Sequence, residues 1–250
     1  MIKFIYVYAV LFVNIADYGV FIIIDLKGDI TKAEGARIKE IHHIVKNNLQ
    51  VISSLISLQT EKLQNTECIN TLKEIQGRIT SIAFVHDELY SSPDLVTLDF
   101  SSYLAKMIKY LLDFYKPKNK NINLTLNVEK ILVGMDTAIP LGIITNELLS
   151  NAVNYAFPYD IGGEITISLY DIKNHDSIGV ISKCQGETHY QYVLIIQDDG
   201  IGIPNDIKFE SSDSLGFQIV NLLVDQIDGC IERETSNGTK FCVWFNNIKL

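Results

Sequence analysis

Two adjacent histidines lie in the segment EIHHIVKNNLQ, from Glu40 to Gln50. Apolar side chains recur around them in alternating steps of three and four, which predicts an amphipathic helix. On this pattern His43 falls opposite the apolar stripe, where an imidazole can meet a second molecule or domain. Taken alone, the pattern favours two surface histidines without a function. The predicted stripe comprises Ile38, Ile41, Val45, Asn48, Ile52, Leu55, Gln59 and Lys62, flanked by Leu49, Ile56 and Leu63.

A second group of polar residues, in the segment NELLSNAVNYAFP, combines two amides with a carboxylate. Asn146, Glu147 and Asn151 share one edge of a predicted helix, because residues four apart lie on the same side. Oxygen atoms that converge there suit a hard cation such as Mg²⁺, which binds through a few protein oxygens and the phosphates of a substrate. The alternative, an ordinary solvent-facing edge, is less favoured because the rest of this helix is apolar.

A third group follows a predicted strand in the segment IIQDDGIGIP. Asp198 comes at the end of the strand, and Gly200 and Gly202 allow the backbone to pass close to a ligand. Further on, Gly216 opens a predicted helix, where free N–H groups and the helix dipole can hold a phosphate. Each of these signals is weak alone, since such glycines are also common in turns.

Composition limits the classes of function. The chain of 250 residues is 47% hydrophobic and can bury a sizeable core. Its net charge of −9 argues against a general nucleic-acid binder, which needs clustered Lys and Arg. The cysteines show no Cys-x-x-Cys pair or metal-ligand spacing, so four free thiols in a reducing cytoplasm are expected. They are Cys68, Cys184, Cys230 and Cys242.

The N-terminal stretch, residues 3–24, is strongly apolar and allows two interpretations. A membrane helix or signal segment is one, but Asn14 and Asp17 interrupt the run, and an Asp in mid-membrane is costly. The other is a β-hairpin, favoured by β-branched and aromatic runs on both sides of a turn-like NIADYG. Membrane association is therefore not expected for this chain.

A helical hairpin is predicted from Thr31 to the SSPD segment at Ser91. Thr31 and Glu34 form a capping box, the first helix runs to about Gln64, and NTE makes a tight connection. Two amphipathic helices cannot bury both of their stripes alone, so a dimeric four-helix bundle is predicted. His86, near the seam, is expected to be packed rather than a second reactive group. The second helix has its apolar face at Ile69, Leu72, Ile75, Ile79, Ile82, Val85 and Leu89.

After the hairpin, helices and strands mix without βαβ regularity, which predicts an α+β domain with helices on one face of a sheet. The predicted helices span residues 100–115, 139–156 and 215–228. The predicted strands span residues 122–128, 163–170, 192–197, 230–234 and 239–245.

The segment around His43 resembles the phosphoacceptor helix of sensor histidine kinases, in the subgroup with the motif E-x-H-H-R-V-K-N-N-L-Q. Only Ile44 departs from it, where that subgroup has Arg. An Asn-bearing helix, Asp-x-Gly-x-Gly after a strand, Leu-Gly-x-x-Ile-Val, and Asn-Gly-Thr before the last strand follow in order. This series resembles the ATP-binding domain of the Bergerat-fold ATPases in its histidine-kinase form. The likeness covers about residues 31–245.

The resemblance implies an α+β chain: a helical-hairpin dimerisation domain, a four-helix bundle as a dimer, followed by an α/β-sandwich ATP-binding domain. Residues 31–92 would form the dimerisation and histidine-phosphotransfer hairpin, and residues 93–250 the catalytic domain. Residues 1–30 would form an N-terminal hairpin. The sequence FIIIDLKGDITKAEG resembles the exit of a PAS sensor domain, so this hairpin is interpreted as a truncated PAS remnant.

Carried over residue by residue, the likeness implies that His43 is phosphorylated from ATP and passes the phosphoryl group to an aspartate of a response-regulator receiver domain. Glu40, three residues before His43, is the hypothetical base or orienter. Asn151 would ligate Mg²⁺, with Asn146 and Glu147 in its shell.

For the nucleotide base, the likeness implies that Asp198 accepts the adenine amino group. Tyr155 would pack beside the base, and Thr239 would complete the edge of its pocket. The glycines that would shape the pocket and its lid are Gly200, Gly202 and Gly216.

Four departures from the family pattern stand out. Asn154 replaces a Lys or His that often assists the phosphates, Ser214 replaces a glycine before the lid helix, and residues 171–190 look like an insertion. Ile44 removes a cation able to pair with phosphate, which predicts slow autophosphorylation. Two other functions stay open: a non-catalytic ATP-binding scaffold or phosphotransfer module, and an ATPase that uses Glu147 to activate water for conformational work.

Overall fold

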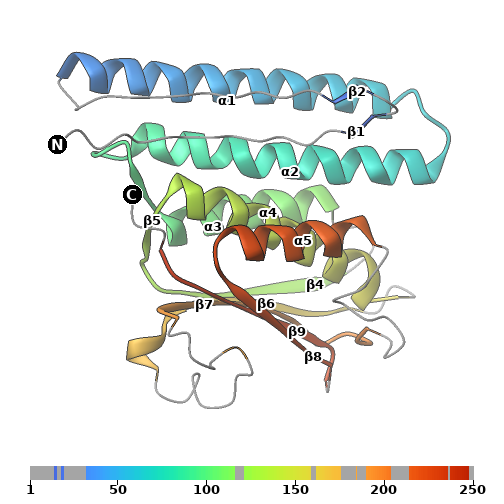
Figure 1. The fold of residues 1–250 in the computed structure, drawn as a ribbon. Coiled ribbons are helices and arrows are strands. Elements are labelled where there is room, and N and C mark those ends of the chain that lie inside the picture. Colours follow the sequence, from blue (N-terminus) through green and yellow to red (C-terminus); the bar gives the residue numbers. More distant parts are fainter. Residues whose placement is uncertain are drawn as a thin grey trace. The chain divides into compact units, whose positions relative to one another are not determined.

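The computed structural model describes residues 14–15, 18–19, 32–115, 121–158, 162–175, 184, 190–203, 214–235 and 237–247. The chain divides into two compact units between Thr97 and Leu98. The first contains a pair of long helices, and the second contains a sheet with helices (Figure 1). Among the described residues, no helix is long and apolar enough to span a membrane.

Two helices, α1 (Lys32–Thr60) and α2 (Thr66–Ser91), run side by side and form the predicted hairpin (Figure 1). Asn65 caps α2, because its side chain accepts a hydrogen bond from the Cys68 N–H at 3.1 Å. Helix α1 ends four residues earlier than predicted. The predicted cap Thr31 lies outside the described residues.

Helix α1 carries two apolar stripes, so the single predicted stripe is wrong. Leu49, predicted on the flank, is 7% exposed and buried, whereas Asn48, predicted in the seam, is exposed. Gln76 of α2 donates to Ser53 at 3.1 Å, which marks the side of α1 that faces α2. A helix can present apolar residues on two sides at once. In α1 the second apolar stripe is exposed in the single chain. Its members include Ile44, Val51, Leu55 and Leu58, each between 48% and 59% exposed.

The N-terminal turn matches the prediction as far as the structure describes it. Strands β1 (Asn14–Ile15) and β2 (Tyr18–Gly19) pair antiparallel, with Asn14 opposite Gly19. The rest of the predicted hairpin and the PAS-like sequence lie outside the described residues.

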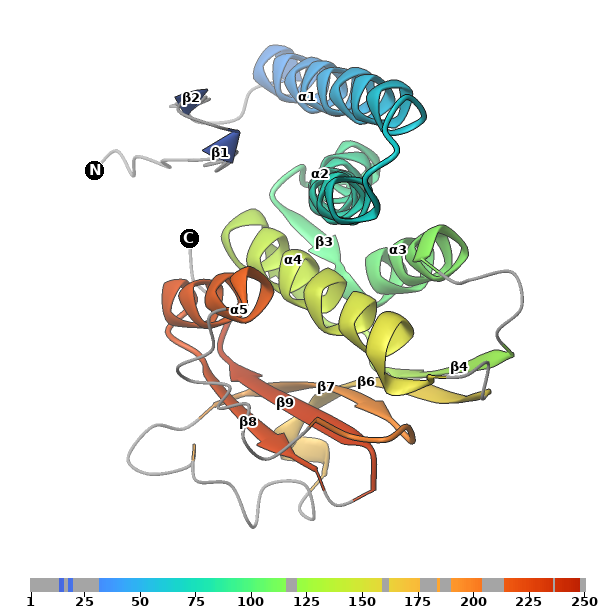
Figure 2. The same cartoon turned by 90° about the vertical axis from the view of Figure 1, so that its right-hand side faces the viewer.

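The second unit confirms the predicted α+β class and most strand positions. Its sheet has the order β4-β6-β7-β9-β8, with β4 and β6 parallel and the other pairs antiparallel. Three helices cover one face of it (Figure 2). The strands are β4 (Ile122–Val128), β6 (Gly163–Asp171), β7 (Tyr192–Asp198), β8 (Cys230–Glu234) and β9 (Thr239–Phe245). The helices are α3 (Phe100–Tyr115), α4 (Met135–Asn151) and α5 (Leu215–Gln226).

Two strands of three residues each escaped prediction. β3 (Thr97–Asp99) pairs with β5 (Leu132–Gly134), and the Phe100 N–H donates to the Ile131 carbonyl at 2.9 Å. Segments this short show no readable alternation of apolar and polar residues.

The expectation of four free thiols is wrong for two cysteines. Cys184 and Cys230 form a disulfide across 46 residues of sequence, with their Cα atoms 5.8 Å apart. Together with Cys242 and Trp244 they belong to one apolar cluster. The disulfide joins Cys184 to Cys230 of β8, a residue distant in sequence, and no local spacing reveals it. The predicted cytoplasmic setting, which rested on free thiols, stays a prediction.

Candidate functional site

The exposed histidine of the helical hairpin is His43, as predicted. Its ring lies 5.9 Å from the ring of Tyr90 on α2, centroid to centroid. Asn47, one turn further along α1, places its side-chain nitrogen 3.4 Å from His43 Nδ1. The imidazole is therefore accessible to a second molecule while one of its nitrogens has a polar neighbour.

His42, by contrast, is buried. It is 3% exposed, and its Nδ1 lies 2.9 Å from Nδ1 of His86, which is 4% exposed. The prediction that His86 is packed is confirmed. His42 also hydrogen-bonds the backbone of Leu95, a residue with a positive φ of 58°. The adjacent residues His42 and His43 thus differ sharply in exposure, because neighbours on a helix point about 100° apart.

The tautomers of this buried pair follow from their partners. Burial lowers the pKa of His42, and the bond to Leu95 partly offsets the shift, so the ring must donate to a carbonyl. Its Nδ1 then accepts the proton of His86 Nδ1. Burial, with the nearby His42, lowers the pKa of His86 to about 4, so both rings are neutral near pH 7.

Two further residues flank His43. Glu40 is exposed, and within the described part of the chain its carboxylate makes no hydrogen bond or ion pair, so the structure does not bring it onto His43. Ile44 is 48% exposed on the second stripe. Lys46, facing the other way, forms an ion pair with Asp87 of α2.

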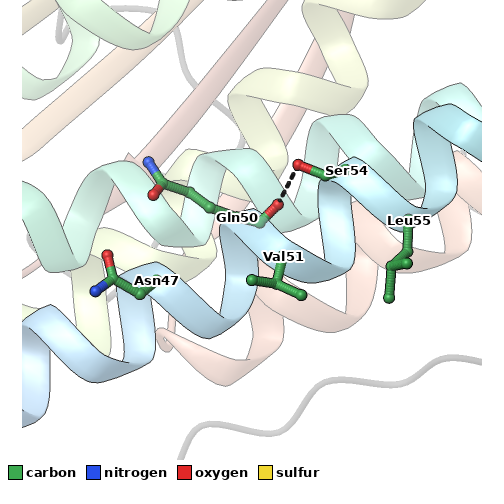
Figure 3. Close-up of a pocket in the computed structure, with 5 residues that line it drawn as sticks. All are labelled: Asn47, Gln50, Val51, Ser54 and Leu55. Carbon is green, nitrogen blue, oxygen red and sulfur yellow. Dashed lines mark hydrogen bonds between the residues drawn. The ribbon is translucent and has the colours of Figure 1, made fainter.

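A shallow hollow follows His43 along the exposed side of α1 (Figure 3). Polar and apolar side chains both line it, and the Ser54 hydroxyl donates to the Gln50 carbonyl at 2.9 Å. Its lining residues are Asn47, Gln50, Val51, Ser54 and Leu55.

In the second unit, Asp198 and Thr239 meet where β7 ends and β9 begins. They are directly opposite in the strand register, and both are buried. Asp198 Oδ1 accepts hydrogen bonds from the N–H groups of Gly200 at 3.0 Å and Thr239 at 3.1 Å. Burial raises the pKa of this carboxyl group, and those hydrogen bonds oppose the shift. The carboxylate is consequently held in one orientation.

The glycines beside Asp198 are required by close backbone approaches. A Cβ on Gly200 would overlap the Ala156 carbonyl, which accepts from the Ile201 N–H at 3.0 Å. Gly238, which the sequence analysis did not single out, has φ +79°, and a Cβ there would overlap the Asp198 carbonyl. Gly202, with φ +74°, lies near Gly238. The segment after β7 thus packs tightly on Ala156, in the turn of helix that follows α4, and on the start of β9.

Helix α4 supplies the polar edge that was predicted. Asn146 is fully buried, and its Nδ2 donates to Glu147 Oε1 at 2.9 Å, while its Oδ1 accepts from the Tyr115 hydroxyl at 3.1 Å. Glu147 Oε2 points to Gly216, since a Cβ on that glycine would lie 3.0 Å from it. The structure therefore brings Gly216 to the adjacent residues Asn146 and Glu147, from which it lies far apart in sequence.

Beyond Glu147, α4 ends at Asn151 and continues as a π-helix, Ala152–Ala156. Such π segments are frequent at functional sites. Asn151 is half-buried, and Tyr155 is 68% exposed on this segment. Tyr155 has no ring contact within the described residues, so its predicted place beside a base is not tested.

Sequence reasoning missed Tyr115, Asn47 and Gly238. Asn47 had a detectable signal, because it lies four residues after His43 on one helix. Gly238 had one too, in the Asn-Gly pair before the last strand. Tyr115 had none, since its partner is 31 residues away.

Comparison with known families agrees with this geometry. A family model described as "Histidine kinase" matches residues 40–115. A second, described as "Histidine kinase-, DNA gyrase B-, and HSP90-like ATPase", matches residues 136–248. The chain belongs to the histidine kinase family. The two matches include His43 on one side and Asn151, Asp198 and Thr239 on the other.

Individual relatives point the same way. The histidine kinase chain is 31% identical over 207 residues to the sensor histidine kinase PdtaS of Mycobacterium tuberculosis, covering 80% of this chain and 36% of that protein. It is 30% identical to PdtaS of Mycolicibacterium smegmatis over 204 residues, covering 80% of this chain and 37% of the relative. It therefore spans only about a third of the length of these relatives.

A solved structure shares the fold. The histidine kinase domain of the EL346 blue-light activated histidine kinase from Erythrobacter litoralis superposes with a TM-score of 0.59 at 17% identity. The match covers 86% of this chain and 94% of that domain.

Proposed function

We propose that this chain is the kinase part of a two-component sensor: it transfers the γ-phosphoryl group of ATP to His43 and then to an aspartate of a response-regulator receiver domain. The observation that carries the proposal is an exposed imidazole beside a buried histidine, on the same chain as an ATPase-type unit. The predicted division into residues 31–92 for phosphotransfer and 93–250 for ATP binding fits the two compact units.

In this proposal Asp198 accepts the adenine amino group. Two backbone N–H groups occupy its Oδ1, which supports Oδ2 as the atom that faces the base. Thr239 completes the edge of the base, Gly200 and Gly202 keep the backbone close to the nucleotide, and Tyr155 packs over the base.

The phosphates are proposed to lie at the N-terminus of α5, where Gly216 exposes backbone N–H groups. Mg²⁺, when bound, neutralises the phosphate charge that develops during transfer. The oxygens available to it fit a hard cation: the Asn151 side chain and Glu147 Oε2 lie one helical turn apart. Asn146 is proposed as a supporting residue, because its amide already binds Tyr115 and Glu147.

In the transfer step, a ring nitrogen of neutral His43 attacks the γ-phosphorus. An N–P bond forms, the bond from phosphorus to the β,γ-bridging oxygen breaks, and ADP leaves with the electron pair. The other ring nitrogen loses its proton to a base. Asn47 is better placed than Glu40 to orient the ring, given its 3.4 Å separation from Nδ1. Glu40 as the base stays a prediction.

The decisive experiment is incubation with Mg²⁺ and γ-labelled ATP, comparing wild type with His43→Gln and His42→Gln. We expect label that is lost in acid and kept in base, and that is absent from the His43 variant. His42→Gln should keep label but lose thermal stability, because His42 is buried. ATP binding without label would support a scaffold instead, and steady phosphate release without label would support an ATPase.

We also propose that the chain is a homodimer through the second stripe of α1. Exposed or half-buried apolar positions spaced three, four or seven apart along a 29-residue helix suit a helix–helix seam. Five such side chains are Ile41, Ile44, Val51, Leu55 and Leu58.

Replacing Leu55 by Lys places a charge in this stripe and is expected to convert dimer to monomer. Leu55 is 56% exposed in the single chain, so its replacement leaves the hairpin core intact. Light scattering coupled to gel filtration gives the mass. Exposed Gln50→Lys, on a different side of α1 from Leu55, is the matched control and should leave the mass unchanged. An unchanged mass for Leu55→Lys would contradict the seam.

Ile44→Arg is expected to speed autophosphorylation, by about fivefold for one charge-assisted hydrogen bond to phosphate. Ile44→Gln controls for loss of the apolar side chain without adding charge. Rates of label incorporation are compared at a protein concentration where light scattering gives one mass for all three proteins. An Arg variant no faster than the Gln variant would contradict a role for a cation here.

A further inference from the structure

Three polar side chains from two helices form a hydrogen-bonded series in the second unit. The Tyr115 hydroxyl, on the last residue of α3, lies 3.1 Å from Asn146 Oδ1, and Asn146 Nδ2 lies 2.9 Å from Glu147 Oε1. Asn146 is 0% exposed and Glu147 is 3% exposed. A series this deeply buried is stable only when its members satisfy one another.

The direction of the series is set by its last member. A carboxylate can only accept, so Asn146 donates to Glu147 Oε1 through Nδ2, and its Oδ1 then points to the Tyr115 hydroxyl, which donates to it. Without the hydroxyl, the buried Oδ1 loses its donor, and the Asn146 amide loses one of the two hydrogen bonds that fix its position.

The last member of the series lies beside the proposed phosphate site. With Oε1 bound to Asn146, the second carboxylate oxygen is directed to Gly216 at the start of α5. A Cβ at position 216 would lie 3.0 Å from Oε2, so the carboxylate would have to shift to admit a side chain there. The hydrogen bond from Asn146 to Oε1 thus helps to set the position of Oε2 relative to the start of α5.

We propose that Tyr115 is a positioning residue for Glu147. Through Asn146 its hydroxyl holds the carboxylate against the N-terminus of α5, so that Glu147 faces the phosphates and their cation in one geometry. The inference rests on the proposed kinase function and extends it to a residue on a different helix. Displacement of the carboxylate by a fraction of an ångström is enough to change rates when a site is preorganised.

The test is a double-mutant cycle with Tyr115→Phe, Glu147→Gln and the double variant. Phenylalanine keeps the edge contact between the rings of Phe114 and residue 115, whose centroids are 5.0 Å apart, and removes only the hydroxyl. Tyr110→Phe, on the same helix, is the matched control. Two readouts are taken for each: the rate of phosphohistidine formation, and the affinity for ADP with and without Mg²⁺.

Tyr115→Phe is expected to slow phosphohistidine formation about fivefold, as for one lost hydrogen bond, and to weaken the effect of Mg²⁺ on ADP affinity. In the Glu147→Gln background the same change should have almost no effect, because there is no carboxylate to position. Equal effects in both backgrounds would overturn the inference, since a purely structural hydroxyl acts regardless of Glu147. So would a Tyr115→Phe protein that matches Tyr110→Phe.

These outcomes differ from failure of the kinase proposal. If wild type forms no phosphohistidine, that proposal fails, and the ADP affinities alone complete the cycle. A Mg²⁺ effect on ADP affinity that is insensitive to Tyr115→Phe then overturns the positioning role as well.

Discussion

Asp198→Asn is expected to weaken ATP binding by at least about 100-fold, because the site exchanges an acceptor for a donor. Backbone N–H groups of Gly200 and Thr239 donate to Oδ1, so the oxygen of the new amide must stay there. Its NH₂ then occupies the place of Oδ2 and opposes the adenine amino group. The opposite orientation would leave two backbone donors without an acceptor.

Asp199→Asn is the matched control for this variant. Asp199 is the next residue, is exposed, and accepts from the Glu164 N–H at 2.7 Å through Oδ1, which an amide oxygen can also do. Titration calorimetry with ATP and Mg²⁺ should give wild-type affinity for Asp199→Asn. Similar affinities for the two variants would remove Asp198 from the base-recognition role, and a large drop in thermal stability of Asp198→Asn would point to folding instead.

Acidification is expected to destabilise the helical hairpin through His86. Its pKa is lowered from 6.5 to about 4 in the folded chain, so the unfolded chain binds the extra proton between these values. The stability that the folded chain gains from keeping His86 neutral is complete above pH 6.5, decreases as the pH falls, and is lost by pH 4. For this shift, the free energy of unfolding is expected to fall by about 2 kcal/mol between pH 7 and 5, and by about 3 kcal/mol between pH 7 and 4.

Urea unfolding at pH 7, 6 and 5 measures this loss. Helices α1 and α2 supply little more than half of the α-helical residues that the structure describes, so the helix signal in circular dichroism reports on both units. The single tryptophan, Trp244, reports on the second unit, and the difference between the two signals gives the hairpin transition. The hairpin transition should move to lower urea as pH falls, and His86→Leu should flatten that dependence. Asp94, whose hydrogen bonds hold its pKa at about 2, acts only below this window. A His86→Leu protein with the wild-type pH dependence would contradict the argument.

Local pattern predicted much of this chain correctly. The strands at residues 122–128, 230–234 and 239–245 and the helix at 100–115 agree with the structure at both ends, because each is an apolar-periodic run between clear turn residues. The exposure of His43 and the burial of His86 followed from helical phase. Asp198 at the end of a strand and Thr239 at the start of another agree with the prediction, whereas their pairing across β7 and β9 was not predicted.

Other features were decided only by the tertiary structure. His42 meets His86 across 44 residues, Cys184 meets Cys230 across 46, and Tyr115 meets Asn146 across 31. Helical or strand phase says which side a residue faces, and says nothing about which distant residue lies there. The two apolar stripes of α1 were predicted as one because helical phase does not tell which apolar residues face α2 and which face outward. Sequence alone determined the family and the order of elements, and it predicted His43 as the acceptor histidine; tertiary packing determined which side chains hold these groups in place.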